Sequence, residues 1–179
     1  RDVKATFVVD GTRSWYVDGA EIETPTAADL SVLTTSAVDT GALRGEVGAK
    51  LRLDGTKLPT ALKLTFDKKN AGSFANLYKK DGDKLVFVAA AKVDASGEVK
   101  LRMSDKGNYA VMLCEFSDIW GDVTNDGVIN SADAVAVLKQ AVGLVQVADP
   151  SKLDYNRDGR LTTADASALL KDYVFGVIG

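Results

Sequence analysis

The first two-thirds of the chain alternates short runs of aliphatic, aromatic and β-branched residues with turns that carry glycine. Apolar and polar residues alternating with a period of 2 predict half-buried strands, and dipeptides such as Asp10-Gly11 and Ser96-Gly97 predict the turns between them. Strands at intervals of roughly ten residues favour a β-sandwich of two antiparallel sheets with an immunoglobulin-like fold. The expected strands are residues 5–9, 14–17, 51–53, 61–66, 75–79, 84–89, 98–103 and 109–114.

Two stretches of this region have patterns that go beyond a single strand. Residues 76–115 contain four consecutive strand patterns, which we expect to form a meander in which each strand pairs with the next. Residues 24–48 fit either a helix-like turn or a strand flanked by loops, and the pattern does not decide between them.

After residue 118 the hydrophobic period changes to 3.6, which predicts helices at residues 131–142 and 163–175 with Gly143 and Gly176 as C-terminal stops. Between these two helices, Asp149 and Pro150 begin a short helical turn. We therefore expect two domains, a β-sandwich at residues 1–117 and a small all-α domain at residues 118–179. The apolar stripes of the helices are Ala134, Val137, Leu138, Ala141 and Val142, and Ala166, Leu169, Leu170, Tyr173 and Val174.

Composition excludes several classes of protein. Of the 179 residues 46% are apolar and 26% are charged, which is typical of a globular protein. The chain has no histidine, so histidine triads and histidine zinc sites are excluded, and the single Cys114 cannot form an intrachain disulfide. A net charge of −3 argues against nucleic-acid binding. The longest apolar run, residues 85–91, is too short to span a bilayer, and no signal peptide opens the chain.

The negative charge is concentrated in the last third of the chain. Residues 1–118 carry 17 basic and 17 acidic residues, whereas residues 119–179 carry 5 and 8, a difference of −3. Six of those eight acids form two sets of identical spacing, offset by 32 residues: Asp122, Asp126 and Asp133, then Asp154, Asp158 and Asp165. The sequence therefore contains an internal repeat.

Each copy of the repeat matches the twelve-residue calcium loop, which places oxygen ligands at positions 1, 3, 5, 7, 9 and 12 and glycine at position 6. Calcium prefers oxygen ligands, and Gly127 and Gly159 permit the sharp turn at position 6. Position 12 is Asp in both copies in place of the usual Glu, so the loop must close more tightly. The expected ligands are Asp122, Thr124, Asp126, the carbonyl of Val128, Asn130 and Asp133, and Asp154, Asn156, Asp158, the carbonyl of Arg160, Thr162 and Asp165.

Residues 119–179 resemble the dockerin family, because the two calcium loops end in Asp, each is followed by a helix, and Gly121-Asp122-Val123 opens the first copy. The resemblance implies two Ca²⁺ ions and a calcium-dependent, non-catalytic adaptor. Its partner would be a cohesin domain of a scaffoldin or cell-surface anchoring protein in an extracellular bacterial cellulosome, which degrades polysaccharides. The β-domain resembles the X modules that accompany dockerins, and we expect it to be structural.

The partner-binding surface follows from the helical spacing and from the same resemblance. Ala132, Val135 and Lys139 share an arc of the first helix away from its core stripe, with Ser131 and Leu138 at its edge. The resemblance implies cohesin contacts at loop positions 10 and 11 and at the Leu-Lys pair of each helix. Because the two copies are nearly identical there, we expect two binding orientations related by a half turn. The corresponding residues of the second copy are Thr163, Ala164, Ser167, Leu170 and Lys171.

Two other functions are weighed against this interpretation. A carbohydrate-binding or glycoside-hydrolase-associated β module could carry the dockerin as a tether; Trp15 and Tyr16 are adjacent, so on a strand only one ring would point outward to stack on a sugar. A calcium sensor could open a groove on binding, but the missing entering helices and only two methionines speak against it.

Overall fold

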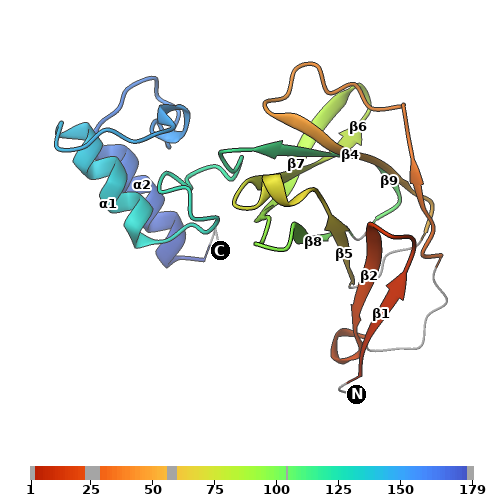
Figure 1. Ribbon diagram of the computed structural model, residues 1–179. Coiled ribbons are helices and arrows are strands. Elements are labelled where there is room, and N and C mark those ends of the chain that lie inside the picture. The colour runs from red at the N-terminus through yellow and green to blue at the C-terminus, as the bar shows by residue number, and fades with distance from the viewer. Residues whose placement is uncertain (1–2, 23–28, 56–59, 104, 177–179) are drawn as a thin grey trace. The chain divides into compact units, whose positions relative to one another are not determined.

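The computed structural model describes residues 3–22, 29–55, 60–103 and 105–176 and confirms the predicted fold class, an all-β N-terminal region and a C-terminal region with two α-helices (Figure 1). The chain divides into two compact units, Arg1–Glu115 and Phe116–Gly179, which we call the β unit and the helical unit. This boundary lies close to the expected one after residue 117; that the two units are separate domains stays a prediction.

The β unit consists of two antiparallel sheets. One sheet has four strands in the order β1 (Lys4–Val8), β2 (Arg13–Asp18), β5 (Thr60–Thr65) and β8 (Glu98–Arg102). The other has five strands in the order β3 (Val32–Thr34), β4 (Glu46–Leu53), β9 (Gly107–Cys114), β6 (Phe74–Asp81) and β7 (Lys84–Lys92). Two short 3₁₀ turns, Gly19–Glu21 and Lys68–Asn70, connect strands.

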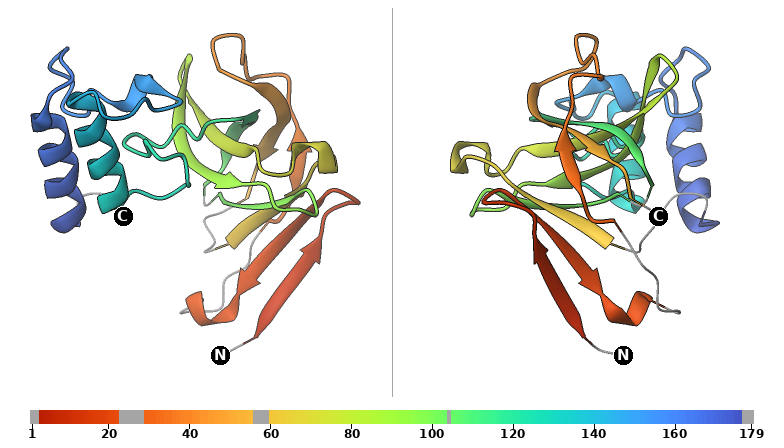
Figure 2. Two further views of the ribbon diagram at one scale, coloured as in Figure 1. Left: turned by 60° about the vertical axis from the view of Figure 1, so that its left-hand side comes forward. Right: turned by 90° about the vertical axis from the view of Figure 1, so that its right-hand side faces the viewer.

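The core of the β unit lies between these sheets (Figure 2). Every second residue of a strand points to the same face, so cross-strand pairs such as Trp15 with Leu62 and Leu77 with Val111 enter one buried cluster. Leu62 and Leu77 are fully buried. The alternation that predicted the strands is therefore the alternation of core and surface positions, which makes the unit a sandwich.

The expected meander over residues 76–115 is confirmed for its first pair, β6 with β7, and is wrong for the strands that follow. β8 pairs with β5 of the four-stranded sheet, and β9 lies between β4 and β6 instead of beside β8. β3, within the undecided stretch 24–48, is a strand; residues 24–28 of that stretch lie outside the described residues. Strand partners are chosen by packing between residues far apart in the sequence, which alternation along one strand does not report.

The helical unit contains α1 (Ser131–Ala141) and α2 (Thr163–Val174), joined through a 3₁₀ turn, Pro150–Lys152. Asp149 caps this turn by accepting a hydrogen bond from the Ser151 N–H, which confirms the predicted helical turn. None of the helices in the described part of the chain is long and apolar enough to cross a membrane.

The two helices pack side by side over a small core of their own (Figures 1 and 2). This core combines Ala134 and Val137 of α1 with Ala166 and Leu169 of α2 and with Val123, Leu153 and Tyr155 from the loops. The predicted apolar stripes are only partly buried, because Leu138, Val142, Leu170 and Val174 are all exposed. One edge of each stripe therefore faces the core and the other forms surface.

Candidate calcium loops and binding face

Residues 122–133, the first loop, and residues 154–165, the second loop, fold with the same hydrogen bonds. In the first loop, the Asp122 carboxylate accepts hydrogen bonds from the N–H groups of Asp126 at 3.0 Å and Gly127 at 3.1 Å. In the second loop, the N–H groups of Asp158 and Gly159 donate to the Asp154 carboxylate at 3.0 and 2.9 Å. The residue at position 1 thus organises the turn in each copy.

The backbone turns sharply at positions 4 and 6 of each loop. Gly127 and Gly159 have φ angles of 93° and 84°, in the left-handed region that glycine adopts at low cost, as the sequence predicted. Asn125 and Arg157, at position 4, also have positive φ, 58° and 59°. Asparagine is a common residue there, whereas nothing in the sequence indicates this conformation for Arg157, whose guanidinium lies 4.4 Å from the centre of the Trp120 ring.

The aspartates at position 12 close the loops and cap the helices at the same time. The Asp133 carboxylate accepts hydrogen bonds from the N–H of Thr124, the N–H of Asn130 and the Thr124 hydroxyl, each at 2.9 Å. The Asp165 carboxylate accepts from the N–H groups of Asn156 at 3.2 Å and Thr162 at 2.9 Å. Asn130 and Thr162 are the N-caps of α1 and α2, so each Asp completes a capping box.

The burial of these carboxylates indicates that a cation fits the loops. Asp133 and Asp165 have no solvent exposure, and in the part of the chain that the structure describes their hydrogen bonds come only from neutral N–H and O–H groups. A buried carboxylate without a cationic partner is costly, and carboxylate, amide, hydroxyl and carbonyl oxygens are the ligands that calcium prefers. The donor set therefore suits a calcium ion in each loop.

The full ligand set stays a prediction. Among residues 3–22, 29–55, 60–103 and 105–176, no three acidic or cysteine side chains gather closely enough to enclose a metal ion by themselves. Three of the six expected ligands in each loop are not carboxylates, and the hydroxyls of Thr124 and Thr162, the amides of Asn130 and Asn156 and two backbone carbonyls would contribute the remaining oxygens.

Two residues of the loops belong to the core, which their position in the repeat did not indicate. Val123 and Tyr155, at loop position 2, are buried, and Trp120 packs against them. The Tyr155 hydroxyl donates to Asp172 at 3.1 Å; burial, together with this carboxylate, raises the pKa of the Tyr155 phenol. These side chains connect the loops to the helices, so the shape of the loops and the placement of the helices are coupled.

The predicted partner-binding residues are all exposed on the helices. Between α1 and α2 lies a shallow, mostly apolar hollow of about 220 Å³. Six of the ten predicted residues line it, together with Ala134 and Ala166: Ser131, Val135, Leu138, Thr163, Ser167 and Leu170. The other four, Ala132, Lys139, Ala164 and Lys171, are exposed but do not line the hollow. We call these ten residues the binding face.

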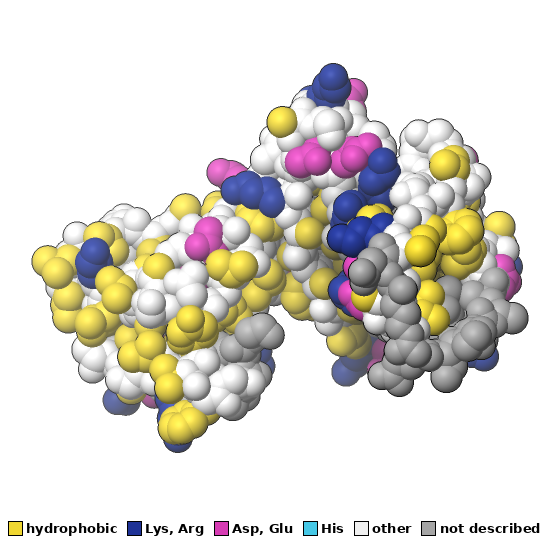
Figure 3. Space-filling view, turned by 90° about the horizontal axis from the view of Figure 1, so that it is seen from below, with side chains coloured by type: hydrophobic (Ala, Val, Ile, Leu, Met, Phe, Trp, Pro, Cys, Tyr) yellow, Lys and Arg dark blue, Asp and Glu magenta, His cyan; other side chains and the backbone are white. Residues whose placement is uncertain are grey.

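Val142 and Val174 extend the apolar surface beyond the prediction. They are 55% and 66% exposed and follow Leu138 and Leu170 by one helical turn. The sequence assigned them to the core because a stripe of this width does not reveal which edge is buried. Figure 3 shows hydrophobic side chains spread over the face of the helical unit seen there, with few charged side chains among them.

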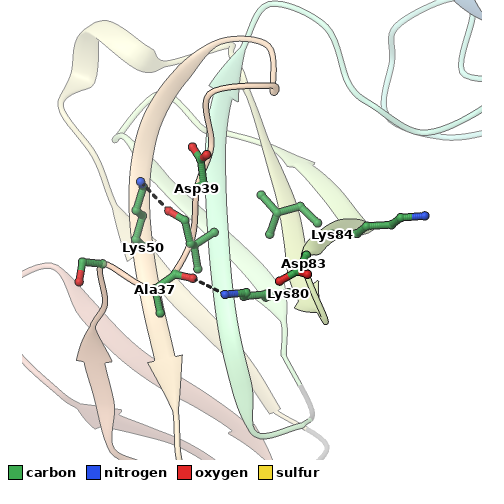
Figure 4. A pocket seen from close by; sticks show the side chains of 9 residues that line it. Ala37, Asp39, Lys50, Lys80, Asp83 and Lys84 are labelled. Carbon is green, nitrogen blue, oxygen red and sulfur yellow. Dashed lines mark hydrogen bonds between the residues drawn. The ribbon is translucent and has the colours of Figure 1, made fainter.

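The β unit has a larger hollow of about 510 Å³, but its polar groups serve the fold (Figure 4). The Lys50 and Lys80 ammonium groups each donate at 2.8 Å to backbone carbonyls, those of Val38 and Ala37. The Lys84 side chain points away from the hollow, and no aromatic ring lines it. The two lysines attach residues 37 and 38 to the neighbouring strands.

A sugar-stacking surface would need an accessible aromatic ring. Trp15 is buried and donates its indole N–H to the Leu30 carbonyl at 2.8 Å, while Tyr16 points to the opposite face, so the expected division of this pair is confirmed. The Lys100 ammonium lies 4.3 Å from the centre of the Tyr16 ring and would compete with a stacked sugar. Nothing at these two rings favours carbohydrate binding.

Part of the chain matches a known protein family. Residues 120–174 match the family model described as the dockerin type I domain, a span that includes both loops, both helices and the whole binding face. Comparisons with curated proteins and with solved structures gave no match.

Proposed function

We propose that residues 120–174 form a dockerin type I domain and that the chain is a calcium-dependent adaptor that anchors its parent protein to a cohesin in an extracellular, polysaccharide-degrading cellulosome. Dockerin domains in general bind cohesins and calcium, are non-catalytic, and typically belong to secreted cellulosome proteins. Cellulosome anchoring of this chain, the count of two ions and the structural role of the β unit, as an X-like module, are parts of the proposal.

The apolar hollow between α1 and α2 is the observation that carries the proposal. Equivalent residues of the two copies line it, Ser131, Val135 and Leu138 from one and Thr163, Ser167 and Leu170 from the other. Exposed leucines that line an apolar hollow, with exposed lysines next to them that do not line it, suit a protein partner that has an apolar patch and an acidic rim.

Calcium would act on the binding face through the loops. Asp122, Asp126 and Asp133 in the first loop, and Asp154, Asp158 and Asp165 in the second, would supply three negative charges to each ion. When bound, the ion neutralises these carboxylates, which repel one another without it. Because Asp133 and Asp165 also cap α1 and α2, neutralisation at the loops stabilises the helix ends that begin the binding face.

Calorimetric titration of the full chain with a panel of cohesin domains tests the proposal. We expect binding in calcium and none after chelation. Leu138→Asp combined with Leu170→Asp should weaken binding by more than about 2 kcal/mol, because both leucines are exposed and line the apolar hollow. Val86→Asp, at an exposed valine of β7 in the β unit, is the matched control and should bind normally. Binding that survives the leucine changes would contradict the proposed face.

A further inference from the structure

A buried polar cluster attaches the first loop to the segment that leads into it. Ser117, which is fully buried, donates its hydroxyl to the Asp122 carboxylate and its N–H to the Asn125 side chain at 2.9 Å. Lys152, only 3% exposed, donates its ammonium to the Asp122 main-chain carbonyl at 3.0 Å and to the Ser117 hydroxyl at 3.3 Å. The first residue of the first loop is therefore held from two sides.

The second loop has no counterpart of this cluster among the described residues. Within the described part of the chain, the half-buried Asp154 carboxylate accepts hydrogen bonds only from the N–H groups of Asp158 and Gly159 in its own loop. The residue 32 positions after Ser117 is Asp149, which instead caps the 3₁₀ turn through Ser151. The residue 32 positions before Lys152 is Trp120, which has no ammonium group.

Outer hydrogen-bond partners orient a ligating side chain before the metal arrives, and changing one commonly lowers metal affinity. We infer that the two calcium sites are not equivalent: Ser117 and Lys152 are positioning residues that hold the first loop in its binding conformation without the ion, whereas the second loop becomes ordered when calcium binds. This inference rests on the proposed calcium binding and adds a division of roles between the two loops.

Amide hydrogen exchange of the unaltered full chain tests this inference directly. The N–H groups of Gly127 and Gly159 donate to the position-1 carboxylates, so their exchange rates report the order of each loop. In chelator, Gly127 should exchange more slowly than Gly159, and calcium should slow Gly159 by the larger factor. Equal rates at the two glycines in chelator would overturn the inference.

Ser117→Ala tests the cluster itself, with Ser151→Ala as matched control because the Ser151 hydroxyl bonds Asp149, which is not a loop ligand. Calcium titration of Ser117→Ala, followed at the Gly127 and Gly159 amides, should show the calcium affinity of the first loop lowered roughly tenfold to hundredfold. The calcium affinity of the second loop should be unchanged. The control should match the unaltered chain. Equal losses at both loops, or no loss, would overturn the inference.

Lys152→Met keeps the length of the side chain but removes its hydrogen bonds to Asp122 and Ser117. In chelator it should speed amide exchange at Gly127 and leave the exchange rate of Gly159 unchanged. An unchanged exchange rate at Gly127 would overturn the role of Lys152.

If neither loop of the unaltered chain takes up calcium, the proposed function fails on that ground. Two bound ions with equally ordered loops in chelator would overturn only the inferred difference between the loops.

Discussion

At the scale of single residues, the loops depend on a few positions that each perform two tasks. Asp133 and Asp165 close a loop and cap a helix, and Val123 and Tyr155 stand inside a loop but pack in the core. We therefore expect substitutions at these positions to affect the proposed calcium sites and the helices together. Their effect on partner binding follows from this coupling, since none of these four residues lines the hollow between the helices.

Gly159→Ala tests how much stability depends on the left-handed backbone conformation at position 6 of the second loop. Gly159 has a φ of 84°, and no atom lies within 4 Å of where a methyl group would be placed, so the change adds left-handed strain without a clash. We expect the helical unit to lose about 1 kcal/mol of stability in saturating calcium, measured by thermal unfolding.

Gly11→Ala is the matched control for this prediction. It has equally open surroundings, and its φ lies outside the left-handed region, so it should unfold as the unaltered chain does. A helical unit that is unaffected by Gly159→Ala would mean that the second loop does not require this turn.

At the scale of elements, α1 and α2 are nearly equivalent in sequence, burial and position. Each begins with a capping box, contributes four residues to the hollow and leaves a lysine exposed at its last turn. Their repeated structure agrees with a face that a partner could meet in two orientations. The asymmetric contacts of Ser117 and Lys152 lie at the first loop and do not touch the residues of the hollow.

Charge reversal in one copy at a time tests the two orientations. Ala132→Glu with Lys139→Glu should leave cohesin affinity nearly unchanged, and so should Ala164→Glu with Lys171→Glu, because the intact copy still offers one orientation. All four changes together should cost more than about 2 kcal/mol of binding free energy in calorimetry. Loss of binding in either single-copy variant would exclude two equivalent orientations.

At the scale of the whole molecule, the two units have separate hydrophobic cores. The core of the β unit is formed by its two sheets, and that of the helical unit by α1, α2 and the loops. Only the second core includes side chains from the proposed calcium loops. Removal of calcium should therefore destabilise one unit and leave the other intact.

Scanning calorimetry with calcium and with chelator tests this division. We expect two unfolding transitions, of which only that of the helical unit moves to lower temperature in chelator. Ions at a hundred times their dissociation constant would contribute about 2.7 kcal/mol at each site. A shift of both transitions, or of neither, would contradict a calcium dependence confined to the helical unit.

Features that depend on neighbours within about twelve residues could be predicted from the amino-acid sequence. The turn at each Gly of the repeat, the spacing of the aspartates, the start of each helix and the alternation within each strand are all set by local backbone geometry and hydrogen bonding. This is why the loops and the helices could be predicted from Gly127, Asp133 and their equivalents, and the all-β character of the first region from the alternation within its strands.

Which elements contact one another could not be predicted from local sequence patterns and became clear from the fold. It placed β8 in the sheet opposite β9, divided each helical stripe between core and surface at Leu138 and Leu170, and brought Lys152 to Ser117 across 35 residues of chain. Such contacts depend on how the apolar area of all elements is buried at once and on which buried polar groups find partners. The burial of apolar area and the pairing of buried polar groups are properties of the whole folded chain, so the sequence of a short segment does not predict them.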